Sequence, residues 1–202
     1  RQMCIRDRER PPHDTAAADS NHPPRKKMMR AAATRHVDGG VVLCLAVNEG
    51  HIAAGTSAQT ISLLDRATLE PLRHLGTAGK PAHRDRINEL CFAPSNMLVS
   101  GGSDGFVHIW DAARSGSASP LTTLASGDQA EVWSVSATAN MLAAGTETAV
   151  VVWDVRKPAA PLARYELHTE AVTRVCFAPG ESGREVARLS GVRSGCMDRA
   201  GF

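Results

Sequence analysis

Three side chains of the types that perform acyl transfer lie near the middle of the chain: His83, Ser100 and Asp104. A Ser-His-Asp triad needs an exposed nucleophile and an oxyanion hole, and the residues around Ser100 indicate neither. The glycine-rich stretch 101–105 lies between two expected strands rather than before a helix, so it does not indicate a phosphate-binding loop. The sequence therefore predicts a protein with no catalytic activity of its own.

Residue types that bind metals are present but scattered. The eight histidines have no ligand spacing with a cysteine pair, and the five cysteines, at positions 4, 44, 91, 176 and 196, form no CxxC motif. Three of these thiols fall in expected strands, where a reduced cysteine behaves as a small apolar side chain. We therefore predict no metal, no cofactor and a reducing intracellular location, cytoplasmic, nuclear or both.

A repeat determines where these side chains stand. The pairs Leu64-Asp65, Trp110-Asp111 and Trp153-Asp154 each close an alternating apolar run, and they are 46 and 43 residues apart. These separations bracket the roughly 40–45 residues of a WD repeat. The phrase Cys-Phe-Ala-Pro at 91–94 recurs 85 residues later, which is close to two such repeats.

Within each repeat, short runs with period-two alternation are bounded by Gly, Asn, Pro and Ser, and no helical period competes with them. The third repeat, for example, reads as strands at 131–137, 141–145, 149–153 and 163–167. This pattern predicts an all-β chain built of four-stranded blades. We expect the blades at about 41–75, 82–124, 130–167 and 168–202.

Residues 82–111 resemble one repeat of the WD-repeat β-propeller family, and residues 141–179 resemble a member of that family without assigned chemistry. The resemblance implies a scaffold that binds other proteins. It also implies that Trp110, Ser100, His83 and Asp104 form, in that order, one buried chain of hydrogen bonds, here called the His83 tetrad.

The other repeats depart from this tetrad. The first has Leu64 in the place of the tryptophan and Ala58 in the place of the aspartate. The third keeps Trp153 but has Glu147 near the aspartate position. The fourth offers a second, partial tetrad of His168, Ser194 and Asp198. We therefore expect a complete network only in the second blade.

We expect the chain to be an N-terminal fragment with about three and a half blades of a larger ring, because propellers typically close with about four to eight blades. Residues 1–8 resemble translated adaptor sequence, and residues 9–27 have no periodic apolar positions. Residues 1–36 are therefore expected to be a disordered leader or an artefact of translation. Residues 37–202 are expected to form the propeller fragment.

The charge and hydropathy of the sequence indicate which kinds of partner to expect. The formal net charge is only +2, and the one basic cluster, at 25–30, falls in the expected leader, so the sequence does not favour nucleic acid. No apolar run approaches the ~18 residues of a membrane span. We therefore expect the partners to be proteins.

In this family partners bind at the end of the blades that carries the turns between the second and third strands and between successive blades. Loops held by rigid strands suit this role. By position alone, the candidate contacts are Arg84, Asp85, Asp128, Gln129, Thr169 and Glu170.

A WDxR motif at Trp153-Asp154-Val155-Arg156 is a second candidate surface. In family members that act as substrate receptors of cullin-RING ubiquitin ligases, the arginine of this motif contacts the ligase's adaptor. Arg156 has the planar fork for a bidentate contact with an acidic partner, and it could equally cap its own blade. A histone-binding or chaperone-type propeller is a third alternative.

Overall fold

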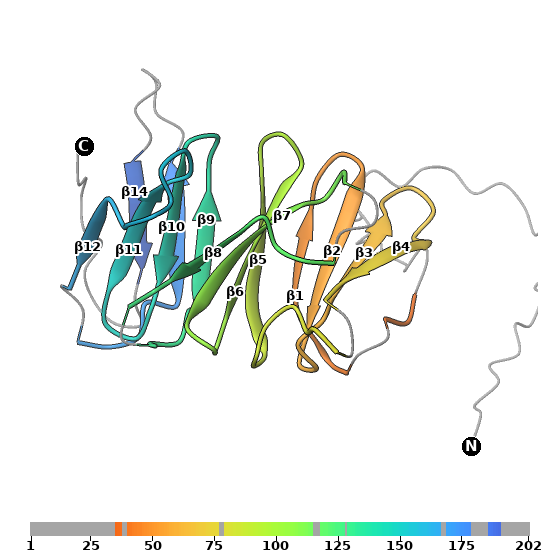
Figure 1. Cartoon of the computed structure of the whole chain (residues 1–202), viewed down its shortest axis with the longest axis horizontal. Coiled ribbons are helices and arrows are strands. Elements are labelled where there is room, and N and C mark those ends of the chain that lie inside the picture. The colour runs from red at the N-terminus through yellow and green to blue at the C-terminus, as the bar shows by residue number, and fades with distance from the viewer. Residues whose placement is uncertain are drawn as a thin grey trace, which may run out of the picture. The chain divides into compact units, whose positions relative to one another are not determined.

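The described residues form antiparallel strands joined by turns. The computed structural model describes residues 35–37, 40–76, 79–114, 118–127, 129–166, 169–178 and 186–190. They make three four-stranded sheets and one two-stranded sheet, and within each sheet the strands pair in chain order (Figure 1). The expected all-β fold class, with four-stranded propeller blades, is confirmed.

The bounds of the strands follow the repeat. The first sheet contains β1 (Val42–Val47), β2 (His51–Thr56), β3 (Ile61–Asp65) and β4 (Pro71–Leu75). The second contains β5 (Ile87–Ala93), β6 (Met97–Gly102), β7 (Phe106–Asp111) and β8 (Thr122–Ala125). The third contains β9 (Ser134–Ala137), β10 (Met141–Gly145), β11 (Val150–Asp154) and β12 (Ala163–Tyr165). The last pairs β13 (Arg174–Ala178) with β14 (Val186–Ser190).

Strand β9 begins later than the strand expected at 131–137. The backbone N–H of Val132 donates to the carbonyl of Gly102 in the second sheet, over 3.1 Å, instead of to a strand of its own sheet. The apolar alternation therefore continues through residues 131–133, although the backbone N–H of Val132 is bonded to the preceding blade and only that of Trp133 is bonded to β10 of its own sheet, by donating to Gly145.

The aspartate that follows the apolar run of each repeat starts the turn after the third strand. A carboxylate oxygen of Asp65, of Asp111 and of Asp154 accepts the backbone N–H two residues later, at 2.9 Å in all three cases. An aspartate side chain that bonds its own chain in this way favours a turn over further strand. The aspartate of each pair is thus explained by local geometry.

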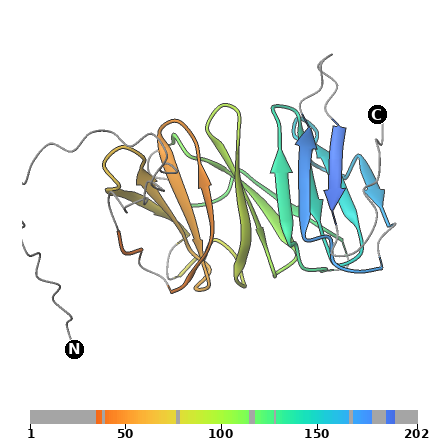
Figure 2. The same cartoon turned by 180° about the vertical axis from the view of Figure 1, so that it is seen from behind.

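Strands β1, β5, β9 and β13 lie side by side, each at the edge of its own sheet (Figures 1 and 2). Polar side chains tie these edge strands together. A carboxylate oxygen of Glu89 accepts the N–H of Val135 at 2.9 Å, and the hydroxyl of Ser134 accepts the N–H of Val175 at 2.9 Å. The second sheet is therefore bonded to the third, and the third to the two-stranded sheet, through a side chain of its first strand.

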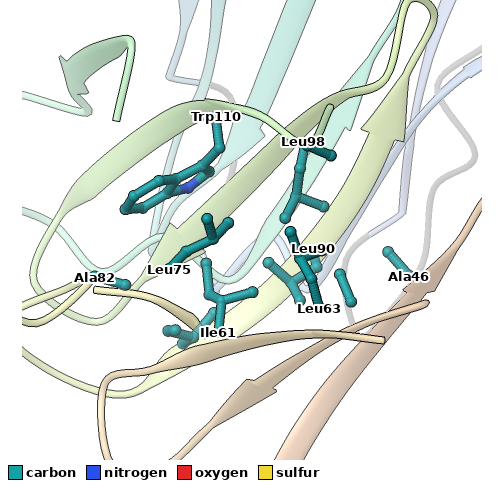
Figure 3. Close-up of a cluster of buried hydrophobic side chains, with 11 residues drawn as sticks. Ala46, Ile61, Leu63, Leu75, Ala82, Leu90, Leu98 and Trp110 are labelled. Atoms are coloured by element: carbon teal, nitrogen blue, oxygen red, sulfur yellow. The ribbon is translucent and has the colours of Figure 1, made fainter. Parts of the chain in front are cut away.

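The apolar core lies between blades. One cluster joins the first sheet to the second, and Figure 3 shows Ile61, Leu63 and Leu75 against Leu90, Leu98 and Trp110. A glycine recurs in the second strand of each full sheet, at 55, 101 and 145, where the next blade approaches closely. A Cβ on Gly101 would lie 2.6 Å from Cγ1 of Val132, so no larger residue fits without movement.

The expected leader lies almost wholly outside the described residues, and its boundary at residue 36 stays a prediction. In the part of the chain that the structure describes, no helix is long and apolar enough to cross a membrane.

Candidate functional site

The structure brings the four residues of the His83 tetrad together in the second blade. Nε1 of Trp110 donates to Oγ of Ser100 at 2.9 Å, and Oγ of Ser100 lies 2.8 Å from Nε2 of His83. Nδ1 of His83 lies 2.9 and 3.1 Å from the two carboxylate oxygens of Asp104. Because an ionised carboxylate can only accept, Nδ1 of His83 carries the proton and Nε2 accepts from Ser100.

The tetrad leaves Ser100 unsuited to attack a substrate. Its side chain is fully buried, and its hydroxyl is engaged by both Trp110 and His83. Nucleophilic catalysis needs a hydroxyl that a substrate can reach. The hydrogen bonds of the His83 tetrad therefore satisfy polar groups that are buried in the blade.

Asp104 remains ionised inside this network. Burial raises the pKa of its carboxyl, but the hydrogen bond and electrostatic interaction with His83, together with the backbone N–H groups of Arg84 and Phe106, outweigh that effect and lower the pKa overall. Hydrogen bonds to the charged form account for the sign. Asp104 therefore fixes both the turn before β7 and the ring of His83.

His108 is a neighbour of this network that the sequence reasoning missed. Its ring centroid lies 4.4 Å from that of His83, and its Nδ1 lies 2.9 Å from Oγ1 of Thr123 on β8. Burial, followed by the electrostatic effect of His83, lowers the pKa of His108 to about 4, although Asp104 raises it. Residues 106, 108 and 110 lie on the same face of β7, because every second residue of a strand points to the same side. This alternation is the signal in the sequence that could have placed His108 beside Trp110 and the rest of the tetrad.

The candidate contact residues lie in the turns that lead into the first strands of successive blades. Arg84 and Asp85 precede β5, Gln129 precedes β9, and Thr169 and Glu170 precede β13, and all five are exposed. Asp128 lies outside the described residues, as do His168, Ser194 and Asp198 of the second partial tetrad.

Arg86 joins two blades at this same end and was not among the expected contacts. Its Nε donates to Oγ of Ser103 at 3.0 Å, and its Nη2 lies 3.4 Å from Oε2 of Glu131. Its guanidinium also lies 5.8 Å from the centre of the Trp133 ring, within cation–π range. The contacts with Glu131 and Trp133 cross to the third blade, so no local pattern in the sequence indicates them.

The WDxR motif lies at the opposite end of the blade, where Trp153 and Asp154 end β11 and Val155 and Arg156 begin the following turn. Trp153 is only 1% exposed and packs in the core between the second and third sheets, which removes it from any contact surface. Arg156 donates to Asp154 through Nε at 2.9 Å and through Nη2 at 2.7 Å, while its side chain stays 69% exposed. The bond from Arg156 lowers the pKa of Asp154 to about 2.

The thiols of Cys44 and Cys91 are partly buried in their strands, whereas Cys176 on β13 is exposed and does not fill the core as expected. Burial raises the pKa of Cys44 and of Cys91 to about 12, and the charge of Glu89 adds to the rise in both. Thiols protonated at neutral pH are poor nucleophiles and poor metal ligands. Cys44, Cys91 and Cys176 are all free cysteines.

The sequence of the chain is similar to those of known proteins. The family described as WD domain, G-beta repeat matches residues 72–111. The chain is 32% identical to a WD repeat-containing protein 89 homolog of Dictyostelium discoideum, over 72% of this chain and 38% of that protein. It is also 32% identical to a DDB1- and CUL4-associated factor 11 homolog of Caenorhabditis elegans, over 59% of this chain and 22% of that protein.

The chain thus spans well under half the length of these two relatives. Among solved structures, the computationally designed Ika4 protein has a TM-score of 0.63 and 22% identity, covering 80% of this chain and 93% of that one. That likeness concerns the fold alone. The sequence repeat, the four-stranded sheets and the similar proteins all indicate the same family.

Proposed function

Because the chain belongs to the WD40-repeat family, we propose that it acts as a non-catalytic scaffold, which binds other proteins through the turns leading into the first strands of its blades. Such turns carry binding residues well, since rigid sheets hold them in place. The engagement of Ser100 within the His83 tetrad supports the absence of catalysis.

One observation carries this proposal: exposed side chains of both charges gather at one end of adjoining blades. Arg84 and Asp85 are exposed, and Arg86 beside them is bonded to Ser103 and Glu131 of two blades. A fixed pattern of opposite charges favours one orientation of a protein partner over others and speeds its association. We call residues 84–86, 129–131 and 169–170 the loop-end surface.

Reversing one charge on this surface tests the proposal. The tagged full chain, as wild type and as Arg84→Glu, is recovered from cell extract, and the bound proteins are quantified by mass spectrometry. We expect at least one partner whose recovery falls roughly tenfold in Arg84→Glu, because charge complementarity steers association.

Arg114→Glu is the matched control. Arg114 is also an exposed arginine in a turn of the second blade, but it follows β7 at the opposite end. Its reversal should leave recovery of that partner unchanged. Equal recovery with Arg84→Glu and wild type, or equal losses with both variants, would contradict binding at the loop-end surface.

A second candidate function is that of a substrate receptor of a cullin-RING ubiquitin ligase. Two relatives, from Caenorhabditis elegans and Caenorhabditis briggsae, are named as homologs of DDB1- and CUL4-associated factor 11. The exposed Arg156 of the WDxR motif supports it as well, although its fork is bound to Asp154. A ligase contact would have to share or replace that bond.

Arg156→Ala distinguishes this second function. If the chain is a substrate receptor of such a ligase, the cullin and its adaptor copurify with the wild type and are lost with Arg156→Ala. The reason is that truncating one partner of a charged contact weakens binding several-fold or more. Lys157→Ala, at the exposed residue next in sequence, serves as the control. Unchanged copurification, or none with the wild type, excludes the ligase function and leaves the scaffold proposal standing.

A further inference from the structure

Two histidines and an aspartate converge beside a cavity at the outer part of the second blade. His83, Asp104 and His108 each bring one donor atom, and these atoms all lie within 4.8 Å of one another. The cavity holds about 300 Å³, and its walls include these three residues together with Arg84, Phe106 and Thr123. The three donor atoms therefore lie beside a cavity that has room for a ligand.

Each of the three donors is oriented by a second hydrogen bond. Nε2 of His83 lies 2.8 Å from the hydroxyl of Ser100, and Nδ1 of His108 lies 2.9 Å from the hydroxyl of Thr123. The carboxylate of Asp104 accepts the N–H of Arg84 at 2.8 Å. Metal-binding histidines almost always have their other ring nitrogen held in this manner, because the second bond fixes the ring and the tautomer.

We propose that His83, Asp104 and His108 bind one divalent transition-metal ion such as Zn²⁺, with the cavity side of the ion left open. Two imidazoles and one carboxylate form a ligand set that suits zinc and its neighbours in the first transition series. Calcium and magnesium prefer oxygen ligands, and this set offers only one carboxylate. The distance of 2.9 Å between Nδ1 of His83 and Oδ1 of Asp104 is compatible with two adjacent ligands about 2.0–2.2 Å from one ion.

Binding exchanges one bond for another in the His83 tetrad. The proton of Nδ1 moves to Nε2, so the imidazole of His83 stays neutral and Nδ1 is free to bind the ion. Nε2 then donates to Oγ of Ser100 over the same 2.8 Å contact, so the direction of that hydrogen bond is reversed. Thr123 continues to hold His108, whose Nδ1 it contacts, so that Nε2 is the nitrogen of His108 without a partner among the described residues.

Calorimetric titration of the full chain with zinc chloride tests the site. We expect one Zn²⁺ bound at the site, with an affinity at least about tenfold weaker in His108→Gln, since even the loss of a residue that supports a ligand costs this much. His108 stands outside the tetrad, so this variant keeps Trp110, Ser100, His83 and Asp104 intact. A urea unfolding curve like that of the wild type verifies that the fold is retained.

His74→Gln is the matched control, because His74 is an exposed strand histidine that also bonds a hydroxyl, that of Ser62, at 2.9 Å. Its zinc affinity should equal that of the wild type. No uptake of zinc by the wild type, or equal affinities in His108→Gln and the wild type, would overturn the proposal.

Discussion

Replacement of His83 by alanine is expected to lower the free energy of unfolding by about 3 kcal/mol or more, because an unsatisfied buried polar group costs about 1–3 kcal/mol and a charged group costs more. The side chains of His83 and Asp104 are 0% and 5% exposed, so Asp104 would keep its charge in a site that water barely reaches. Ser100 would also lose the acceptor for its hydroxyl. Urea denaturation, monitored by tryptophan fluorescence, measures the change.

His74→Ala provides the comparison for this effect. His74 bonds Ser62 much as His83 bonds Ser100, but it is exposed and has no buried carboxylate beside it. We expect a change within about 0.5 kcal/mol, as for most surface substitutions. Similar losses in the two variants would show that the His83 tetrad contributes nothing particular to the blade.

Replacement of Gly101 by valine is expected to cost about 1–3 kcal/mol or more, because the new side chain overfills the contact between the second and third blades. The atoms nearest to an added Cβ are Cγ1 of Val132, at 2.6 Å, and Cγ1 of Val135, at 2.8 Å, both from the third blade. The blades would have to separate to make room. A lower midpoint of urea unfolding would report the loss.

Gly50→Ala is the control for this second prediction. Gly50 lies in the turn between β1 and β2, where an added Cβ would meet no atom within 4 Å. Its replacement should change stability by no more than about 0.5 kcal/mol. If Gly101→Val were equally harmless, the close approach of the blades at this glycine would be refuted.

The repeat made the blades predictable from the sequence. Alternating apolar runs and turn residues act over a few positions, so β10 and β11 fall within one residue of the strands expected at 141–145 and 149–153. The start of β9 was misplaced because Val132 bonds Gly102 of another blade, which no alternation can reveal. The alternation of apolar residues is a local property of the sequence. The residue at which β9 begins is instead decided by a contact with another blade.

The candidate sites were less predictable for the same reason. His108 reads as an ordinary residue of an alternating strand, and only the packing of β7 beside the turn of His83 brings the two rings within 4.4 Å. Likewise, Arg86 and Glu131 stand far apart in the sequence and meet where two blades join. Contacts between blades arise from the register of neighbouring sheets, which a single sequence does not encode in any short motif.

If rigid blades present the loop-end surface to a protein partner, hydrogen exchange will detect both the rigidity of the blades and the contact. Amides of β6, β7, β10 and β11 should exchange slowly in the free chain, because inner strands open least often. On addition of the partner identified with Arg84→Glu, exchange should slow further at residues 84–86 and 129–131. Protection confined to the opposite turns, at 48–50 and 66–70, would contradict the account.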